Sequence, residues 1–91
     1  MRKGICNKYS IRRSQDYTIL INIYNSREIY LFDGVAKTII DNLDKSNNDI
    51  VKIIRAKYNV TKECAERDLN KFINNLLKYK ILEVKNVWYR D

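Results

Sequence analysis

Two apolar segments near the start of the chain, residues 17–24 and 27–32, flank a short polar stretch. Along each segment successive side chains are expected to point to opposite faces, which is the period of a β-strand. Asn25 and Ser26 suit a turn, because short polar side chains tolerate the backbone angles that turns require. The pattern therefore predicts a β-hairpin.

A further strand is expected at residues 9–13, followed by a polar turn. If this strand pairs with residues 17–24, then residues 28–32 form the edge of a three-stranded antiparallel sheet. An edge strand has unpaired backbone groups, which must be covered by other structure, protected against pairing, or used to bind another chain. We expect this edge to be used, by taking up a strand from another peptide.

After residue 33 the apolar residues recur at helical spacing, and three helices are predicted. The first covers residues 34–44 with Asp33 as its N-cap, and the second runs from a cap at Asn48 to Asn59. Thr61 is expected to cap the third helix. The buried stripe of this third helix consists of Ala65, Leu69, Phe72, Ile73, Leu76 and Leu77.

Residues 81–84 are expected to leave the third helix as an extended segment, and residues 87–89 to add a last strand, which would give a short C-terminal hairpin. The order β-β-β-α-α-α predicts an α+β fold, because the apolar helix faces must be buried against one another and one face of the sheet. The length suits a single domain, 1–91, with its core at about residues 9–83.

The residue inventory argues against catalysis. The chain has no histidine, which removes the usual general base and the commonest metal ligand. Gly4 and Gly34 are too few for a phosphate-binding loop, and Cys6 and Cys64 do not make a zinc site. We therefore expect no enzyme activity, no metal and no cofactor. Without a signal peptide or an apolar run of membrane-spanning length, the chain is expected to be cytoplasmic, with reduced thiols.

The formal net charge of +7 is unevenly distributed along the chain. Residues 1–13 carry five cations and no acid, whereas residues 33–49 have a negative balance. Such an excess favours an anionic partner, either nucleic acid or an acidic peptide.

The order and spacing of the hairpin and of residues 31–43, 49–60 and 64–82 resemble a known family. They are similar to the PqqD-like proteins, which are winged-helix-like recognition elements for the precursors of ribosomally synthesised and post-translationally modified peptides (RiPPs). In length the chain is similar to the stand-alone leader-binding proteins of lasso-peptide pathways. Where the family usually has glycine before the closing apolar pair, this chain has Lys80.

The resemblance implies non-catalytic binding of the leader segment of a precursor peptide. The leader would add as a strand to residues 28–32, in the groove beside the third helix. The domain would then present the precursor to a modification enzyme such as a radical enzyme, a protease or a cyclase. The implied peptide-binding residues are Glu28, Ile29, Tyr30, Leu31, Phe32, Arg67, Asp68, Leu69, Lys71, Phe72, Ile73 and Asn75.

Several of these residues also have a purely structural interpretation. Five apolar side chains are expected to pack in the core and to form the groove floor as well: Ile29, Leu31, Leu69, Phe72 and Ile73. Tyr30 and Phe32 are expected on the opposite, solvent-facing side of the strand, where they would mark an interface. Cations at the rim would either form a solvated helix face or meet leader carboxylates: Arg67, Lys71 and Lys78.

The alternative function is DNA binding by a winged helix-turn-helix. The basic charge and the last two helices suit it. However, the first turns of the third helix carry Glu63, Glu66 and Asp68, which would be repelled by phosphates. The edge strand is also able to pair with a second copy, so a monomer or a weak dimer is expected.

Overall fold

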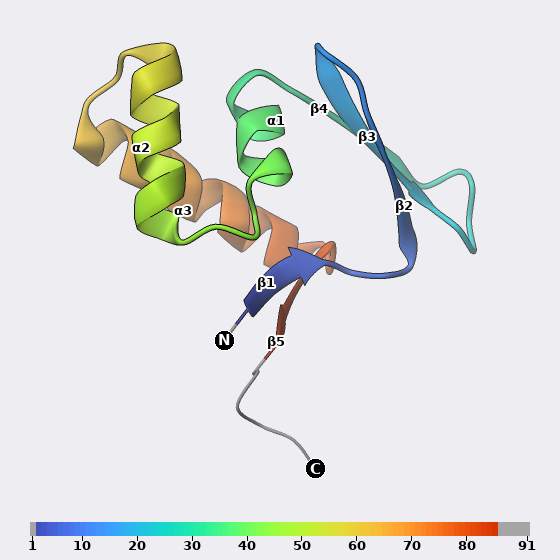
Figure 1. The fold of residues 1–91 in the computed structure, drawn as a ribbon. Helices are drawn as coiled ribbons and strands as arrows, with labels where there is room; N and C mark the ends of the chain where they lie inside the picture. The colour runs from blue at the N-terminus through green and yellow to red at the C-terminus, as the bar shows by residue number, and fades with distance from the viewer. Residues whose placement is uncertain (1, 86–91) are drawn as a thin grey trace.

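The computed structural model describes residues 2–85. Its elements in chain order are β1 (Arg2–Ile5), β2 (Tyr9–Arg13), β3 (Tyr17–Asn22), β4 (Ile29–Asp33), α1 (Gly34–Asp41), α2 (Asn47–Tyr58), α3 (Lys62–Lys78) and β5 (Leu82–Lys85). Figure 1 shows the three helices on one side of the sheet formed by β2, β3 and β4. Between β1 and β5, the predicted order of three strands followed by three helices is confirmed.

The central sheet is antiparallel, with the order β2-β3-β4. Tyr9 lies opposite Asn22 on β3, and Leu20 of β3 lies opposite Tyr30 of β4. The prediction that the last strand of the hairpin forms the sheet edge is therefore confirmed. Both strands of the hairpin are shorter at the turn than predicted, because Asn22 and Asn25 accept hydrogen bonds from the backbone N–H groups of Tyr24 and Arg27.

The two faces of β4 are the reverse of those predicted. Tyr30 and Phe32 pack against the core, whereas the side chains of Ile29 and Leu31 are 55% and 59% exposed. The prediction that Ile29 and Leu31 are core residues, and that Tyr30 and Phe32 face solvent, is wrong. The register explains this result, since Tyr30 lies opposite the fully buried Leu20 and so shares its inward face.

The helix boundaries follow the local cap chemistry. The hydroxyl of Thr61 accepts from the backbone N–H of Cys64, so the predicted cap of α3 is confirmed. The predicted cap of α2 at Asn48 is wrong. The N-cap is Ser46, two residues before Asn48, and its hydroxyl accepts from the backbone N–H of Asp49. Asp33 is at the N-cap position of α1 but its side chain makes no cap hydrogen bond, and α1 ends at Asp41, before the predicted residue 44.

Two residues adopt left-handed backbone angles at junctions that position the site. Gly34 joins β4 to α1 with a φ of +56°, an angle that glycine adopts without steric cost. Lys80 has a φ of 60° after α3, where the N–H of Ile81 bonds to the carbonyl of Leu76. This closing pattern favours glycine, and a side chain there costs roughly 1–2 kcal/mol.

The helices bury one continuous core beneath the inner face of the sheet. Leu20, Ile39, Ile50, Ile54 and Leu69 are almost fully buried at its centre. Leu69 is thus confirmed as a core residue. Because α1 contacts both β3 and β4, the core fixes this helix directly beside the sheet edge.

A second, two-stranded sheet joins the first and last strands of the described residues. β1 pairs antiparallel with β5, and the N–H of Cys6 donates to the carbonyl of Ile81 at 2.7 Å. The strand Arg2–Ile5 was not predicted, because its short basic sequence has no clear alternation. The other expected strand of the C-terminal hairpin, residues 87–89, lies outside the described residues.

A partly buried polar cluster links the sheet to α1. The carboxylate of Asp41 accepts hydrogen bonds from the Thr18 hydroxyl at 2.8 Å and the Arg13 Nε at 3.1 Å, and it pairs with Lys37. Burial by itself would raise the pKa of Asp41, but the hydrogen bonds from Lys37, Thr18 and Arg13 outweigh it and lower the pKa. Residues of β2, β3 and α1 are therefore held by one charged side chain.

The two faces of the sheet are distinguished by a matched pair of substitutions. Leu20→Ala should lower the free energy of unfolding by about 2–5 kcal/mol, because it leaves a cavity in the core. Leu31→Ala should change it by less than about 0.5 kcal/mol, since that side chain is largely exposed. Urea denaturation measures both, and equal losses would contradict the inward and outward assignment.

Candidate functional site

The open edge of β4 presents the backbone groups of alternate residues to a peptide. The backbone N–H of Asn22 donates to the carbonyl of Glu28 at 3.0 Å, so these two residues form a hydrogen-bonded pair. Hydrogen-bonded and non-hydrogen-bonded pairs alternate along an antiparallel ladder. The backbone groups of Tyr30 therefore face β3, and those of Ile29 and Leu31 face the open edge. An extended chain is able to pair with these two residues.

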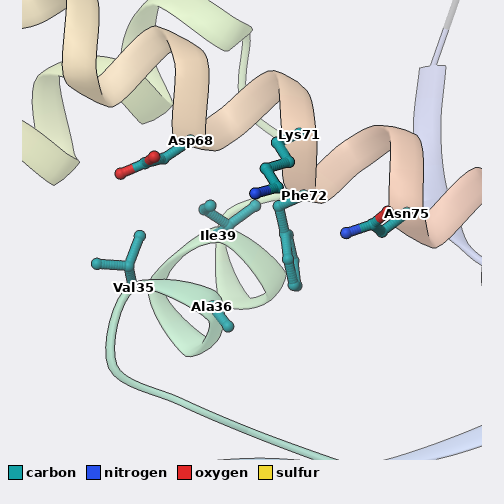
Figure 2. A pocket seen from close by; sticks show the side chains of 7 residues that line it. All are labelled: Val35, Ala36, Ile39, Asp68, Lys71, Phe72 and Asn75. Carbon is teal, nitrogen blue, oxygen red and sulfur yellow. The ribbon is translucent and has the colours of Figure 1, made fainter.

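A pocket of about 240 Å³ lies between α1 and α3, close to the C-terminal end of β4. Figure 2 shows Phe72 extending from α3 toward α1, whose side chains complete the apolar wall. Asp68, Lys71 and Asn75 of α3 place polar groups around this wall. The complete lining consists of Val35, Ala36, Ile39, Asp68, Lys71, Phe72 and Asn75.

A row of aromatic rings connects the edge strand to this pocket. The rings of Tyr30 and Phe32 stack with centroids 6.5 Å apart, and Phe32 meets Phe72 edge-on at 5.7 Å. Such aromatic contacts contribute about 0.5–1.5 kcal/mol beyond area burial. The open edge and the pocket wall are therefore parts of one packed surface.

Glu28 lies immediately before β4, and its side chain is bonded within the sheet. Its carboxylate accepts from the hydroxyls of Tyr9 at 2.6 Å and Tyr30 at 2.7 Å, and from the Asn22 amide at 2.7 Å. These hydrogen bonds, from Tyr9 first, lower the pKa of Glu28 to about 2. The hydrogen bond to Glu28 is in turn the main cause of the raised pKa of Tyr30. The Glu28 side chain thus lies on the inner face of the sheet, with Tyr9, Asn22 and Tyr30, and does not extend toward the open edge.

The predicted site residues of α3 separate into three groups. Asp68, Lys71, Phe72 and Asn75 line the pocket together. Leu69 is buried on the side of the helix that faces α2, and Ile73 is half-buried against the core. Arg67 is exposed and does not line the pocket.

Sequence reasoning missed the contribution of α1. Val35, Ala36 and Ile39 line the pocket, although the helical pattern had assigned that helix to the core only. A signal was present, because Val35 follows the edge strand after only Asp33 and Gly34. A helix that begins directly at a strand end must place its first turn beside that end.

The start of α3 is poorly suited to a nucleic-acid groove. Glu63 and Asp68 are exposed there and Glu66 is half-buried, so the first turns present carboxylates. Among residues 2–85, no group of three or more side chains is placed to hold a metal ion. Within the same residues, no helix has both the length and the apolar character needed to span a membrane.

Comparisons with known proteins agree with this geometry. The family described as coenzyme PQQ synthesis protein D (PqqD) matches residues 19–82. The fold is similar to that of TbiB1 in complex with the TbiA(beta) leader peptide, with a TM-score of 0.79, 27% identity, and coverage of 97% of this chain and 99% of that chain. It is also similar to lasso peptide synthetase B1 complexed with the leader peptide, with a TM-score of 0.81, 17% identity, and coverage of 92% and 100%. No curated protein matches the sequence significantly.

The lowered pKa of Glu28 predicts how stability depends on acid. An ordinary glutamate has a pKa of about 4.5, and in the folded chain this one has a pKa of about 2. Its contribution to stability is therefore present above about pH 4.5 and is lost as the pH falls through about 2. Urea denaturation across this range should show a steeper loss for the wild type than for Glu28→Gln. If the free energy of unfolding fell equally with pH in the two proteins, the hydrogen bonds from Tyr9, Tyr30 and Asn22 would not favour the ionised carboxylate of Glu28.

Proposed function

The chain belongs to the PqqD family, and from this membership we propose that it binds the leader segment of a ribosomally synthesised precursor peptide and presents the precursor to a modification enzyme. The observation that carries this proposal is the open edge of β4 beside the pocket between α1 and α3. The leader adds as a fourth strand to β4. One of its apolar side chains enters the pocket.

The energetics require both parts of this site. Two edge-facing residues offer four backbone groups, each of which contributes a net of about 0.5–1.5 kcal/mol when paired. Micromolar affinity needs about 8 kcal/mol. Full burial of one large apolar side chain supplies about 1.5–3 kcal/mol. The strand pairing therefore gives the orientation, and apolar burial in the pocket and along the outer face gives much of the remaining affinity.

The outer face of the sheet supports the presentation step. Ile29 and Leu31 are exposed on this face, beside the half-buried Ile19 and Ile21 to which they are paired. Exposed apolar surface of this kind is typical of interaction sites. A leader strand on β4 would continue the same face with its own alternate side chains. We place the contact with the enzyme here, on a surface made jointly by the domain and the bound leader.

The chain itself is proposed to be non-catalytic and to act in the cytosol. The whole sequence has no histidine, and both Cys6 and Cys64 are free thiols. The modification chemistry therefore belongs to the partner enzyme, which we place among the radical enzymes, proteases or cyclases. The exposed start of α3 carries acids, which disfavours the docking of this helix on duplex DNA.

Leu31→Pro tests the strand addition. Proline removes a backbone N–H that faces the open edge but leaves the ladder to β3 intact, so the protein should fold and lose leader binding by at least about tenfold. The measurement is an amide NMR titration with the leader of the neighbouring precursor, in which wild-type shifts should concentrate at residues 28–33 and in α3.

The matched control for this substitution is Leu31→Ala, which shortens the same side chain and keeps the N–H. It should retain more binding than the proline variant. A folded proline variant that binds the leader as the wild type does would exclude this edge. Salt-sensitive shifts with a DNA duplex and none with the leader would replace the proposal by nucleic-acid binding.

Lys71→Glu tests the polar rim of the pocket. Reversal of this exposed charge should weaken an acidic leader by roughly three- to fivefold at low salt, and the effect should shrink as salt is added. Lys45→Glu makes the same change in net charge at an exposed position outside the pocket and serves as the control. Equal effects of the two variants on the dissociation constant would show that only net charge matters.

A further inference from the structure

Polar groups from β2, β3 and β4 converge on the single carboxylate of Glu28. Its Oε2 accepts from the hydroxyl of Tyr9, which belongs to β2, and from that of Tyr30, which belongs to β4. Its Oε1 accepts from the amide of Asn22, which belongs to β3. Hydrogen bonds to an ionised acceptor are shorter and stronger than neutral ones. The side chain of Glu28 thus links all three strands by hydrogen bonds at the end of the sheet near the hairpin turn.

This carboxylate is linked to the distant pocket through side-chain packing. The Tyr30 ring meets the Tyr9 ring edge-on at 5.9 Å and stacks on Phe32 at 6.5 Å. Phe32 in turn contacts Phe72, which lines the pocket. Tyr30, whose hydroxyl donates to Glu28, therefore belongs to a row of packed rings that ends at Phe72 in the pocket.

Near the turn the edge strand is held by backbone hydrogen bonds to β3 and the turn, such as that from the Asn22 N–H to the Glu28 carbonyl, and by the Glu28 carboxylate, which also reaches β2. Among the described strands β4 pairs with β3 only, and residues 23–27, which lead into it, are exposed. When a peptide adds to a mobile edge, part of the binding free energy is needed to order the edge. The observed affinity is then reduced in proportion to the fraction of molecules in which the edge is already ordered. An edge that is already ordered avoids this cost.

We propose that Glu28 is a positioning residue for peptide addition: through its bonds to Tyr9, Asn22 and Tyr30 it orders β4 and, by way of Phe32, positions Phe72 in the wall of the pocket. This inference rests on the proposed function. Glu28 does not touch the peptide in this arrangement. Its effect on affinity is transmitted through Tyr30 and the aromatic row.

The test compares Glu28→Gln with Ile54→Val. The first variant keeps the size of the side chain and loses the charge, whereas the second trims the buried core of α2 and leaves the three strands untouched. The probe is the synthetic leader of the neighbouring precursor, titrated by calorimetry. Glu28→Gln should weaken the dissociation constant by about tenfold, roughly the worth of one charge-assisted hydrogen bond. Ile54→Val should leave it unchanged even though its unfolding midpoint falls.

Two further measurements on the same variants do not depend on the leader. In Glu28→Gln the amides of Tyr30 and Phe32 should exchange with solvent faster, while the amides of α2 and α3 keep the wild-type rate. Tyrosine ionisation, followed by absorbance, should occur at a lower pH in this variant. Burial is the first cause of the raised pKa of Tyr9 and Glu28 the second, whereas the hydrogen bond to Glu28 is the main cause of the raised pKa of Tyr30.

The outcomes separate the inference from the function on which it rests. A wild-type chain that does not bind the leader would overturn the proposed function, and the exchange rates of Tyr30 and Phe32 would still decide whether Glu28 orders the edge. If the wild type and Glu28→Gln bind equally, the inference is wrong and the function stands. An equal loss of affinity in Ile54→Val would also overturn the inference, because affinity would then follow global stability.

Discussion

A strand at the edge of a sheet has half of its backbone hydrogen-bonding groups unpaired, and β4 is such a strand. Much of the structure serves to hold this strand from one side only. β3 pairs with it in the sheet, and the inward rings of Tyr30 and Phe32 anchor it to the core and to α3. Because the anchoring uses only the inner face, the edge and the outer face are left free for partners.

Two carboxylates secure the sheet at its opposite ends. Glu28 joins the three strands near the hairpin turn, and Asp41 joins Thr18 and Arg13 to α1 at the other end. The pKa of each is lowered, by hydrogen bonds that favour the ionised form. Glu28 therefore restrains the edge strand itself near the turn, whereas Asp41 restrains β2 and β3 at the opposite end of the sheet.

The pocket shows why strand and helices have to be considered together. α1 begins at Gly34, directly after β4, so its first turn lies beside the end of the edge strand. α3 crosses opposite and contributes Phe72 together with polar side chains. A peptide lying on β4 therefore reaches a pocket whose two walls come from helices that are distant in sequence. Membership of the PqqD family accords with this arrangement.

The sequence by itself determined the order of the elements, the edge position of β4 and the Thr61 cap, because each depends on local periodicity or on the chemistry of a few neighbouring residues. It also placed Asp68, Lys71, Phe72 and Asn75 on one helix near that edge. Tertiary structure alone decided which face of β4 is buried, since alternation separates two faces without telling which of them meets the helices. The pairing of β1 with β5, the Glu28 cluster and the contribution of α1 to the pocket likewise join residues far apart in the chain. Such contacts depend on how the elements pack, which no local pattern contains.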